Sequence, residues 1–335
     1  MDPQRARRPR ACPSRRKPLL YAAVASVVLV SATGGGTANV RARAHGTTGL
    51  VSSSAASSAD ADADVGADVG ASAPASDASR TPEAAVESVA AVPTPTVDRD
   101  ALLAGTMDSV TVEDGAKVSV AVVDLDSGES SAYGDGTFET ASIVKVDILA
   151  ALLLRAQDAD RELTAREKAN ATVMIKNSDN ASATALWNEI GRAEGLAAAN
   201  ERLGLSETEG GNGPLWGLTQ TTAADQLTLL GQVFGDESEL SEASRTYLRG
   251  LMEDIAVDQQ WGVSAAGSEF ALKNGWLPRS TTGLWVINSI GRVTADGHAY
   301  LVAALSNGNS TMAKGVSLVE SAAKAAVSSL RNPEV

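Results

Sequence analysis

The chain has 335 residues and a formal net charge of −13 at pH 7, with one cysteine, Cys12, and two histidines, His45 and His298. One cysteine cannot form an intramolecular disulfide, and so few cysteine and histidine ligands argue against a zinc site. The negative charge argues against nucleic acid or anionic lipid as a partner. A Ser-His-Asp triad would have to use His298, which lies in a turn signal between two strand-like runs, so we expect none.

The first 38 residues have the pattern of an export signal. Residues 1–17 carry seven Arg or Lys, and the apolar run 19–31 is followed by small residues, with a cleavage site predicted after Ala38. The run of thirteen residues is shorter than the roughly 20 that span a bilayer, although an uncleaved membrane anchor is the alternative. The sequence "SRRKPLL" at 14–20 also resembles a twin-arginine signal, which leaves the export route open.

Residues 39–98 are predicted to be a disordered linker. From residue 45 onward this segment consists mainly of Ala, Ser, Asp, Thr, Val and Gly, and it contains no aromatic residue. Such a composition buries too little apolar surface to offset the entropy lost on ordering. With the export signal before it, this linker would belong to a secreted protein, and it could tether the domain to the cell envelope. Cleavage after Ala38 would change the net charge from −13 to −19, because residues 1–38 carry seven basic side chains and one acidic side chain.

The remaining residues, 99–335, are sufficient for one globular domain. The alternating run 117–130 predicts a strand that ends in a turn, and 130–136 predicts its hairpin partner. Apolar periodicity then predicts a series of helices, followed by three strands and a last helix. The helices are expected at 142–156, 163–175, 181–190, 194–203, 221–234, 241–254 and 311–330, and the strands at 269–276, 283–293 and 298–308.

This order of elements predicts an α+β fold. Strands early and late in the domain are expected to form one antiparallel sheet from both ends of the chain. The helices between them form an inserted all-helical lobe, over about residues 141–268. A cleft is expected between the lobe and the sheet.

Ser142 and Lys145 stand at the start of a helix that is apolar on all sides, "IVKVDILAALLL". They are three residues apart and therefore share one face of the helix. A helix N-terminus stabilises developing negative charge, and burial lowers the pKa of a lysine, so a partly neutral Lys145 can take the proton of Ser142. Read alone, the pair is better explained by a capping serine and a lysine that reaches toward solvent, because S-x-x-K often arises by chance.

Two further stretches follow in order along the chain. Residues Ser178-Asp179-Asn180 precede an amphipathic helix, and Lys273-Asn274-Gly275 end a predicted strand. Together with S-x-x-K at 142–145, they resemble the signature of the penicillin-recognising serine enzymes, and the class A β-lactamase family in particular. The resemblance spans roughly residues 105–330, and "NSDNASATAL" is its most specific part.

The resemblance implies a role for each of these catalytic residues. Ser142 would be the acylated nucleophile, with Lys145 as its base or proton relay. Ser178 would pass a proton to the leaving nitrogen, and Asp179 would have a structural role in turning the loop.

It also implies the substrate-binding residues. Asn180 would hold the substrate amide, Lys273 would attract the substrate carboxylate, and Asn274 and Gly275 complete that motif. The backbone N–H groups of Ser142 and Trp276 would form the oxyanion hole. The implied substrate is a β-lactam or a peptidoglycan peptide; no metal or cofactor is implied, and we expect a monomer.

Three departures from the family pattern bear on function. The spacing from Ser142 to Ser178 is 36 residues, which is shorter than usual and trims the helical lobe. Asn274 replaces the usual threonine or serine, and a hydroxyl that contacts the substrate carboxylate is lost. The loop 204–221 is short and lacks the E-x-x-L-N element whose glutamate activates the deacylating water. The alternative source of such a base is Glu207 or Glu209 together with Asn212.

These departures leave three hypotheses. The first is an exported serine hydrolase that is acylated by β-lactams and hydrolyses them with slow deacylation. The second is a D-alanyl-D-alanine peptidase of peptidoglycan, which needs no such glutamate. The third is a module that binds β-lactam or cell wall without turnover.

Overall fold

The computed structural model describes residues 97–331, all of which belong to one compact unit. The predicted export signal, 1–38, and nearly all of the predicted linker, 39–98, lie outside the described residues. None of the helices within 97–331 has the length and apolar character needed to cross a membrane.

The domain is built on a five-stranded antiparallel sheet with the order β2-β1-β7-β6-β5. The early hairpin pairs with the last strand, because β1 lies against β7 over its whole length. The sheet therefore joins both ends of the domain, as predicted. Its strands are β1 (Lys117–Asp124), β2 (Ser130–Tyr133), β5 (Glu269–Pro278), β6 (Trp285–Ala295) and β7 (His298–Asn309).

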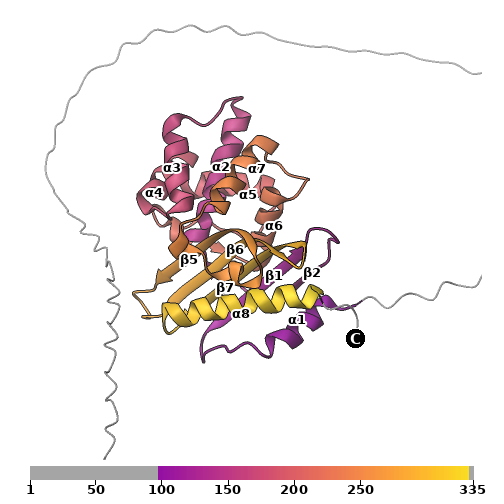
Figure 1. Ribbon diagram of the computed structural model, residues 1–335. Helices are drawn as coiled ribbons and strands as arrows, with labels where there is room; N and C mark the ends of the chain where they lie inside the picture. The colour runs from indigo at the N-terminus through magenta and orange to yellow at the C-terminus, as the bar shows by residue number, and fades with distance from the viewer. Residues whose placement is uncertain (1–96, 332–335) are drawn as a thin grey trace, which may run out of the picture. The chain divides into compact units, whose positions relative to one another are not determined.

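Helices cover both faces of this sheet (Figure 1). α1 (Arg99–Met107) and α8 (Met312–Arg331) lie on one face, where Leu103, Tyr300 and Val319 are buried in a single apolar cluster. The other face carries the inserted helical lobe, with its own larger apolar cluster. The lobe consists of α2 (Val144–Asp158), α3 (Ala165–Lys176), α4 (Asn180–Ile190), α5 (Arg192–Leu203), α6 (Ala223–Phe234) and α7 (Glu242–Glu253).

Local sequence signals explain where the lobe helices begin and end. Thr164 and Glu167 form a reciprocal capping box at α3, so two otherwise unpaired N–H groups are satisfied. The Asp179 side chain accepts from the Ser182 N–H and caps α4. α5 ends at Gly204, which takes the left-handed conformation that glycine adopts without steric cost.

The predicted order of elements is confirmed, with local differences. The first strand is shorter than predicted, because it ends at Asp124 and a turn follows before β2. α1 was not predicted from the sequence; Asp98 caps it and Leu103 and Met107 bury one face. A short ladder between β3 (Phe138–Glu139) and β4 (Gln220–Thr221) was also missed, because two-residue strands carry no periodicity.

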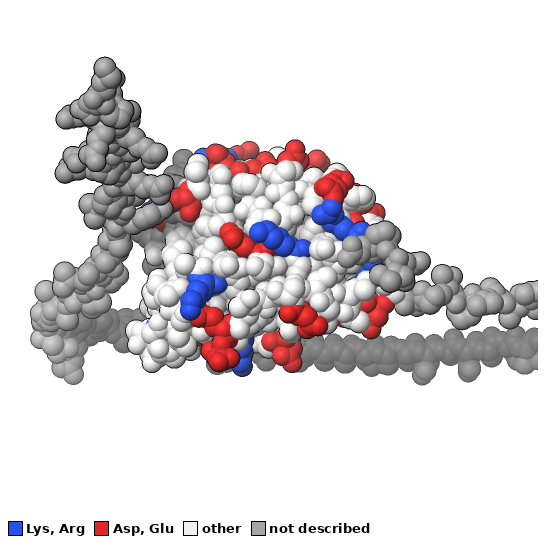
Figure 2. All heavy atoms as spheres, turned by 60° about the horizontal axis from the view of Figure 1, so that its bottom comes forward, with Lys and Arg blue, Asp and Glu red and all other residues white. Residues whose placement is uncertain are grey.

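Figure 2 turns the α8 and α1 side of the molecule forward, and basic side chains there lie singly, next to acidic ones. Ion pairs of this kind join elements near the ends of the domain, namely Arg99–Glu129, Lys314–Glu113 and Arg331–Asp296. This face therefore offers a polyanion no continuous basic surface.

α2 also buries an acidic side chain, Asp147, which is fully enclosed and receives only a long contact of 3.5 Å from Gln226 Nε2. Burial raises the pKa of Asp147 to about 7, and the nearby Asp225 adds to the effect. Because this pKa lies above that of the unfolded chain, the folded state binds the extra proton. The resulting stability is present at low pH and is lost as pH rises through about 7.

We therefore expect Asp147→Asn to weaken the pH dependence of stability, because the amide cannot ionise. Between pH 6 and pH 8.5 the melting temperature of the wild type should fall more than that of the variant. At pH 8.5 the variant should be the more stable by about 1 kcal/mol or more, since one pKa unit is worth about 1.4 kcal/mol. Thermal unfolding followed by circular dichroism measures this, and equal falls in the two proteins would contradict it.

Candidate active site

Ser142 lies in the short 3₁₀ turn Ala141–Ile143 that leads into α2, and it is 8 % exposed. Strand β5 passes close to this turn at Gly275. A Cβ added at Gly275 would lie 2.6 Å from the Thr140 carbonyl oxygen and 2.9 Å from the Ser142 nitrogen. Only a glycine at this position lets the sheet edge approach the backbone N–H of the serine so closely.

Lys145 is fully buried, and its ammonium is surrounded by oxygen acceptors. Its Nζ donates to Ser142 Oγ at 2.9 Å and to Asn180 Oδ1 at 2.9 Å. It also contacts the carbonyl oxygen of Ser178 at 2.7 Å and the hydroxyl of Ser178 at 3.0 Å. Ser142, Ser178 and Asn180, which come from the two predicted motifs, are thus all hydrogen-bonded to Lys145 Nζ.

The second lysine, Lys273, reaches the same hydroxyl from strand β5. Its Nζ donates to Ser178 Oγ at 3.1 Å and to the carbonyl oxygen of Asn274 at 3.0 Å. Ser178 is held between the two lysines in a left-handed backbone conformation with φ of 57°. A non-glycine residue in this conformation costs roughly 1–3 kcal/mol, and such strain is often found at functional sites.

Burial sets the protonation of these two lysines. It lowers the pKa of Lys145 to about 7, while the negative charge of Asp179 partly opposes the effect. Burial also holds the pKa of Lys273 well below its usual value, and the charge of Lys145 lowers it further. Hydrogen bonds from Ser182 keep the pKa of Asp179 low, so this residue remains a carboxylate.

The amide of Asn274 points to the other side of β5. Its Nδ2 donates to the carbonyl oxygens of Gln259 at 2.7 Å and Trp261 at 3.0 Å. Because both N–H groups are used and the side chain is fully buried, Asn274 has no free donor for a substrate carboxylate in this structure. In this structure Asn274 holds the 259–261 segment, and its predicted membership of the substrate-binding site stays a prediction.

Trp276 is the next residue of β5 after Gly275, and it lies at the predicted position beside the site. The Trp276 ring packs edge-on against the Trp261 ring, with the two centroids 6.1 Å apart. Lys273 Nζ lies 6.0 Å from the centroid of the Trp276 ring. The proposed oxyanion role of the Trp276 backbone N–H stays a prediction.

Sequence reasoning missed two residues at this site. Asn288 on β6 donates to the carbonyl oxygens of Glu139 at 2.8 Å and Thr140 at 3.0 Å, and thereby ties the sheet to the turn before Ser142. Trp216, in the short loop after α5, places its ring over Lys145 Nζ at 4.9 Å from the centroid. Neither belongs to a recognisable motif; only its placement in the fold identifies it.

The acidic residues of the short loop are not hydrogen-bonded to this cluster. Glu207, Glu209 and Asn212 are all exposed. The backbone of Glu209 pairs with Gln220 at 2.9 Å in both directions, and the N–H of Glu207 donates to Asp225. In the described part of the chain, no hydrogen bond joins the carboxylate of Glu207 or Glu209 to Ser142, Lys145 or Ser178.

His298 also lies apart from the serine cluster. Its Nδ1 is 3.2 Å from Asp126 Oδ2, and these two residues form a small group with Asp124 in which the potential metal-ligand atoms lie within 4.8 Å of one another. Asp126 and His298 are exposed, and in the described part of the chain no hydrogen bond joins the three residues to Ser142, Lys145 or Ser178.

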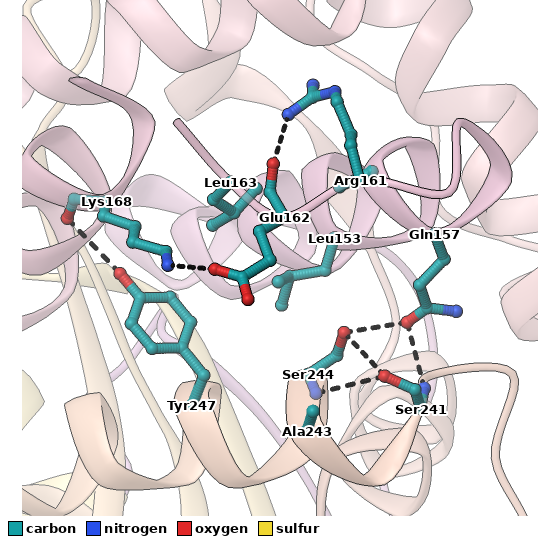
Figure 3. Close-up of a pocket in the computed structure, with 11 residues that line it drawn as sticks. Leu153, Gln157, Arg161, Glu162, Leu163, Lys168, Ser241, Ala243, Ser244 and Tyr247 are labelled. Carbon is teal, nitrogen blue, oxygen red and sulfur yellow. Dashed lines mark hydrogen bonds and ion pairs between the residues drawn. The ribbon is translucent and has the colours of Figure 1, made fainter. Parts of the chain in front are cut away.

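A pocket of about 310 Å³ lies in the helical lobe between α2, α3 and α7 (Figure 3). Its polar groups are paired among themselves: Lys168 with Glu162, and Gln157 with Ser244. None of the predicted site residues lines it.

The cluster as a whole is equipped for acyl transfer. A serine hydroxyl lies within hydrogen-bond distance of a buried lysine whose pKa is near neutrality, and a second serine stands between that lysine and another cation. This is the geometry of a nucleophile with an adjacent base and a separate proton carrier.

The family model described as "Beta-lactamase enzyme family" matches residues 160–330. The match includes the Ser178 and Lys273 motifs but begins after Ser142 and Lys145. A comparison with curated protein sequences gives no match.

Among solved structures, PBP-A is similar at 21% identity, with a TM-score of 0.59 and coverage of 69% of this chain and 96% of that one. A point mutant of PBP-A, solved as an acyl-enzyme complex with penicillin G, is similar at 20% identity, with a TM-score of 0.58 and coverage of 69% and 96%. A class A β-lactamase from Bacteroides cellulosilyticus is similar at 14% identity, with a TM-score of 0.59 and coverage of 70% and 99%. At such low sequence identities, the similarity to these structures supports a shared fold and no more. Taken with the family match, they place the chain in the β-lactamase enzyme family, among the penicillin-recognising serine hydrolases.

Proposed function

We propose that this protein is an exported serine hydrolase that forms an acyl-enzyme at Ser142 with β-lactams. The observation that carries the proposal is the contact of 2.9 Å between the Nζ of Lys145, which is fully buried, and Ser142 Oγ. A surface lysine would stay charged at neutral pH, whereas a pKa of about 7 leaves much of Lys145 neutral and able to accept a proton.

The proposed reaction begins when neutral Lys145 takes the proton of Ser142 Oγ and the oxygen attacks the lactam carbonyl. The carbonyl oxygen becomes an oxyanion, which the backbone N–H groups of Ser142 and Trp276 stabilise. The C–N bond then breaks, and the leaving nitrogen takes a proton from Ser178. Lys145 returns its proton to Ser178 across their contact of 3.0 Å.

Two further residues position the substrate in this proposal. Asn180 presents its amide beside Lys145, where its N–H group remains to bind a substrate carbonyl. Lys273 supplies positive charge behind Ser178 for the substrate carboxylate and lowers the proton affinity of the Ser178 hydroxyl.

The acyl-enzyme is proposed to decay slowly. Its hydrolysis needs a water that is held and deprotonated next to the ester carbonyl. The acidic side chains of the short loop, Glu207 and Glu209, are exposed and are not hydrogen-bonded to the serine cluster. Without a general base the water step typically loses about 10²–10⁴-fold in rate.

The same features support a second candidate, a D-alanyl-D-alanine peptidase, because its acyl group can be released without a loop glutamate. Separate assays with penicillin G and with a peptide ending in D-alanyl-D-alanine distinguish the two. We expect a stoichiometric penicillin adduct and little D-alanine release. Rapid and sustained D-alanine release would make the peptidase the correct function, and the lack of any covalent adduct with either compound would leave a binding module.

Export is proposed from the sequence alone, on the basis of residues 1–38. N-terminal sequencing of the protein recovered outside the cell should begin after Ala38. A mature protein that still begins before residue 31 would instead indicate a membrane anchor.

A further inference from the structure

Trp216 is a large aromatic residue that the reaction scheme does not use. Its ring lies over the Lys145 ammonium, 4.9 Å from the ring centroid, and its side chain is only partly exposed. An ammonium within about 6 Å of an aromatic face is attracted by the electron density of that face, and the attraction increases where water is excluded. Here the cation is fully buried.

Hydrogen bonds hold both the ring of Trp216 and the loop that carries it. Its Nε1 donates to Thr184 Oγ1 of α4 at 3.1 Å. The Trp216 carbonyl accepts from the Thr219 hydroxyl at 2.7 Å, and the Thr219 carbonyl accepts from the Thr140 N–H at 2.8 Å. The loop that carries Trp216 is thus fastened to the backbone just before Ser142.

Few other charges face Lys145. Asp179, at the start of α4, stabilises the ammonium. Lys273 of β5, whose pKa the charge of Lys145 lowers, contacts the same Ser178 hydroxyl. Asp147 lies on the same helix, but its carboxylate contacts Gln226. No hydrogen bond in the described residues pairs Lys145 with a carboxylate, so the ring face and the negative charge of Asp179 compensate the ammonium beside the neutral oxygen acceptors.

We propose that Trp216 is a positioning residue that holds the Lys145 ammonium against Ser142 through its ring face. This inference rests on the proposed function, in which Lys145 is the base. In the resting enzyme the ring restrains the charged amine among its four oxygen contacts. It also sets the pH at which the amine becomes a base, because it favours the charged form.

The proposal predicts a shift in the pH dependence of acylation. Neutral Lys145 is the reactive form, so the acylation rate should rise through the pKa of this lysine. Replacing the ring with an aliphatic side chain removes the stabilisation of the ammonium and should move the midpoint to lower pH. The expected shift for Trp216→Leu is roughly 0.5–1.5 pH units, given the usual strength of a cation over an aromatic ring.

The experiment uses penicillin G with the wild type, Trp216→Leu, Trp216→Phe and the control Leu215→Ala, an exposed neighbour in the same loop. Rapid quenching followed by intact mass gives the acylation rate from pH 5 to pH 9. Trp216→Phe keeps an aromatic face and loses only the hydrogen bond to Thr184, so its midpoint should stay within about 0.3 units of the wild type. Leu215→Ala should leave the midpoint unchanged.

A direct titration separates this inference from the proposed function. The pKa of Lys145 can be followed in the free protein by NMR of carbon-labelled lysine, with no β-lactam present. A lower pKa in Trp216→Leu supports the inference even if the wild type forms no adduct. A pKa that is unchanged or higher in Trp216→Leu overturns it, because the ring would then act only by excluding water.

Discussion

Ser142→Ala is expected to abolish covalent labelling by penicillin G, because the proposed reaction acylates Ser142 Oγ and uses the Ser178 hydroxyl only to carry a proton. Lys145→Ala should slow labelling by about 10²–10⁴-fold, the usual contribution of a general base. The reason is that Lys145 Nζ lies 2.9 Å from Ser142 Oγ, and the described residues offer that hydroxyl no other hydrogen-bonded group that could take its proton. Time-resolved intact-mass measurement at pH 7.5 gives both results.

Lys176→Ala is the matched control for this pair. Lys176 pairs with Asp254 on the surface and makes no contact with the serine cluster, so its removal should leave the labelling rate unchanged. Circular dichroism must show that each variant is folded, since Lys145→Ala creates a buried cavity. Labelling that persists in Ser142→Ala would show that another residue is the nucleophile.

Hydrolysis of a chromogenic β-lactam is expected to begin with a burst close to one equivalent of enzyme and then to continue slowly. Acylation has its nucleophile, base and proton carrier in contact, but deacylation lacks a carboxylate that holds a water at the ester. The steady rate should therefore lie about 10²–10⁴-fold below the acylation rate. Stopped-flow absorbance at several enzyme concentrations measures the burst and the steady rate together.

Glu207→Gln and Glu209→Gln should change the steady rate little. The backbone of Glu209 is fixed in a bridge with Gln220, both side chains are exposed, and neither carboxylate is hydrogen-bonded to Ser142, Lys145 or Ser178 in the described part of the chain. The opposite finding would be fast, linear hydrolysis without a burst that is lost in Glu209→Gln. In that case the short loop would carry the deacylating base, and the protein would be an efficient β-lactamase.

The fold was predictable where sequence periodicity is long. The apolar helix after Ser142 and the three late strands each extend over many residues, and all were located within a few residues of their observed ends. α1 was not located, because a nine-residue amphipathic helix next to the predicted linker gives a weak signal. The two-residue ladder of β3 and β4 depends on pairs of residues that are 83 and 81 positions apart, which periodicity cannot detect.

The candidate site was predictable where residue types recur at a fixed spacing. Ser142, Lys145, Ser178 and Lys273 were found from their motifs, and the structure brings them together. The orientation of Asn274 was not predictable, because which face of β5 an amide occupies depends on the packing of the 259–261 segment.

Trp216 and Asn288 were missed for a related reason. Each contributes through one tertiary contact, a ring over Lys145 in one case and a pair of hydrogen bonds to the turn before Ser142 in the other. For a tryptophan in a loop or an asparagine in a strand, no sequence pattern predicts such a contact. These residues can be found only once the fold has been established.

The most direct test of the account is peptide mapping of the wild-type protein after exposure to penicillin G. The protein is quenched in acid, digested and analysed by mass spectrometry to locate the modified residue. We predict one adduct per chain, located on Ser142. An adduct located on any other residue, or no adduct after prolonged exposure of the folded protein, would contradict the assignment of Ser142 and Lys145 as nucleophile and base.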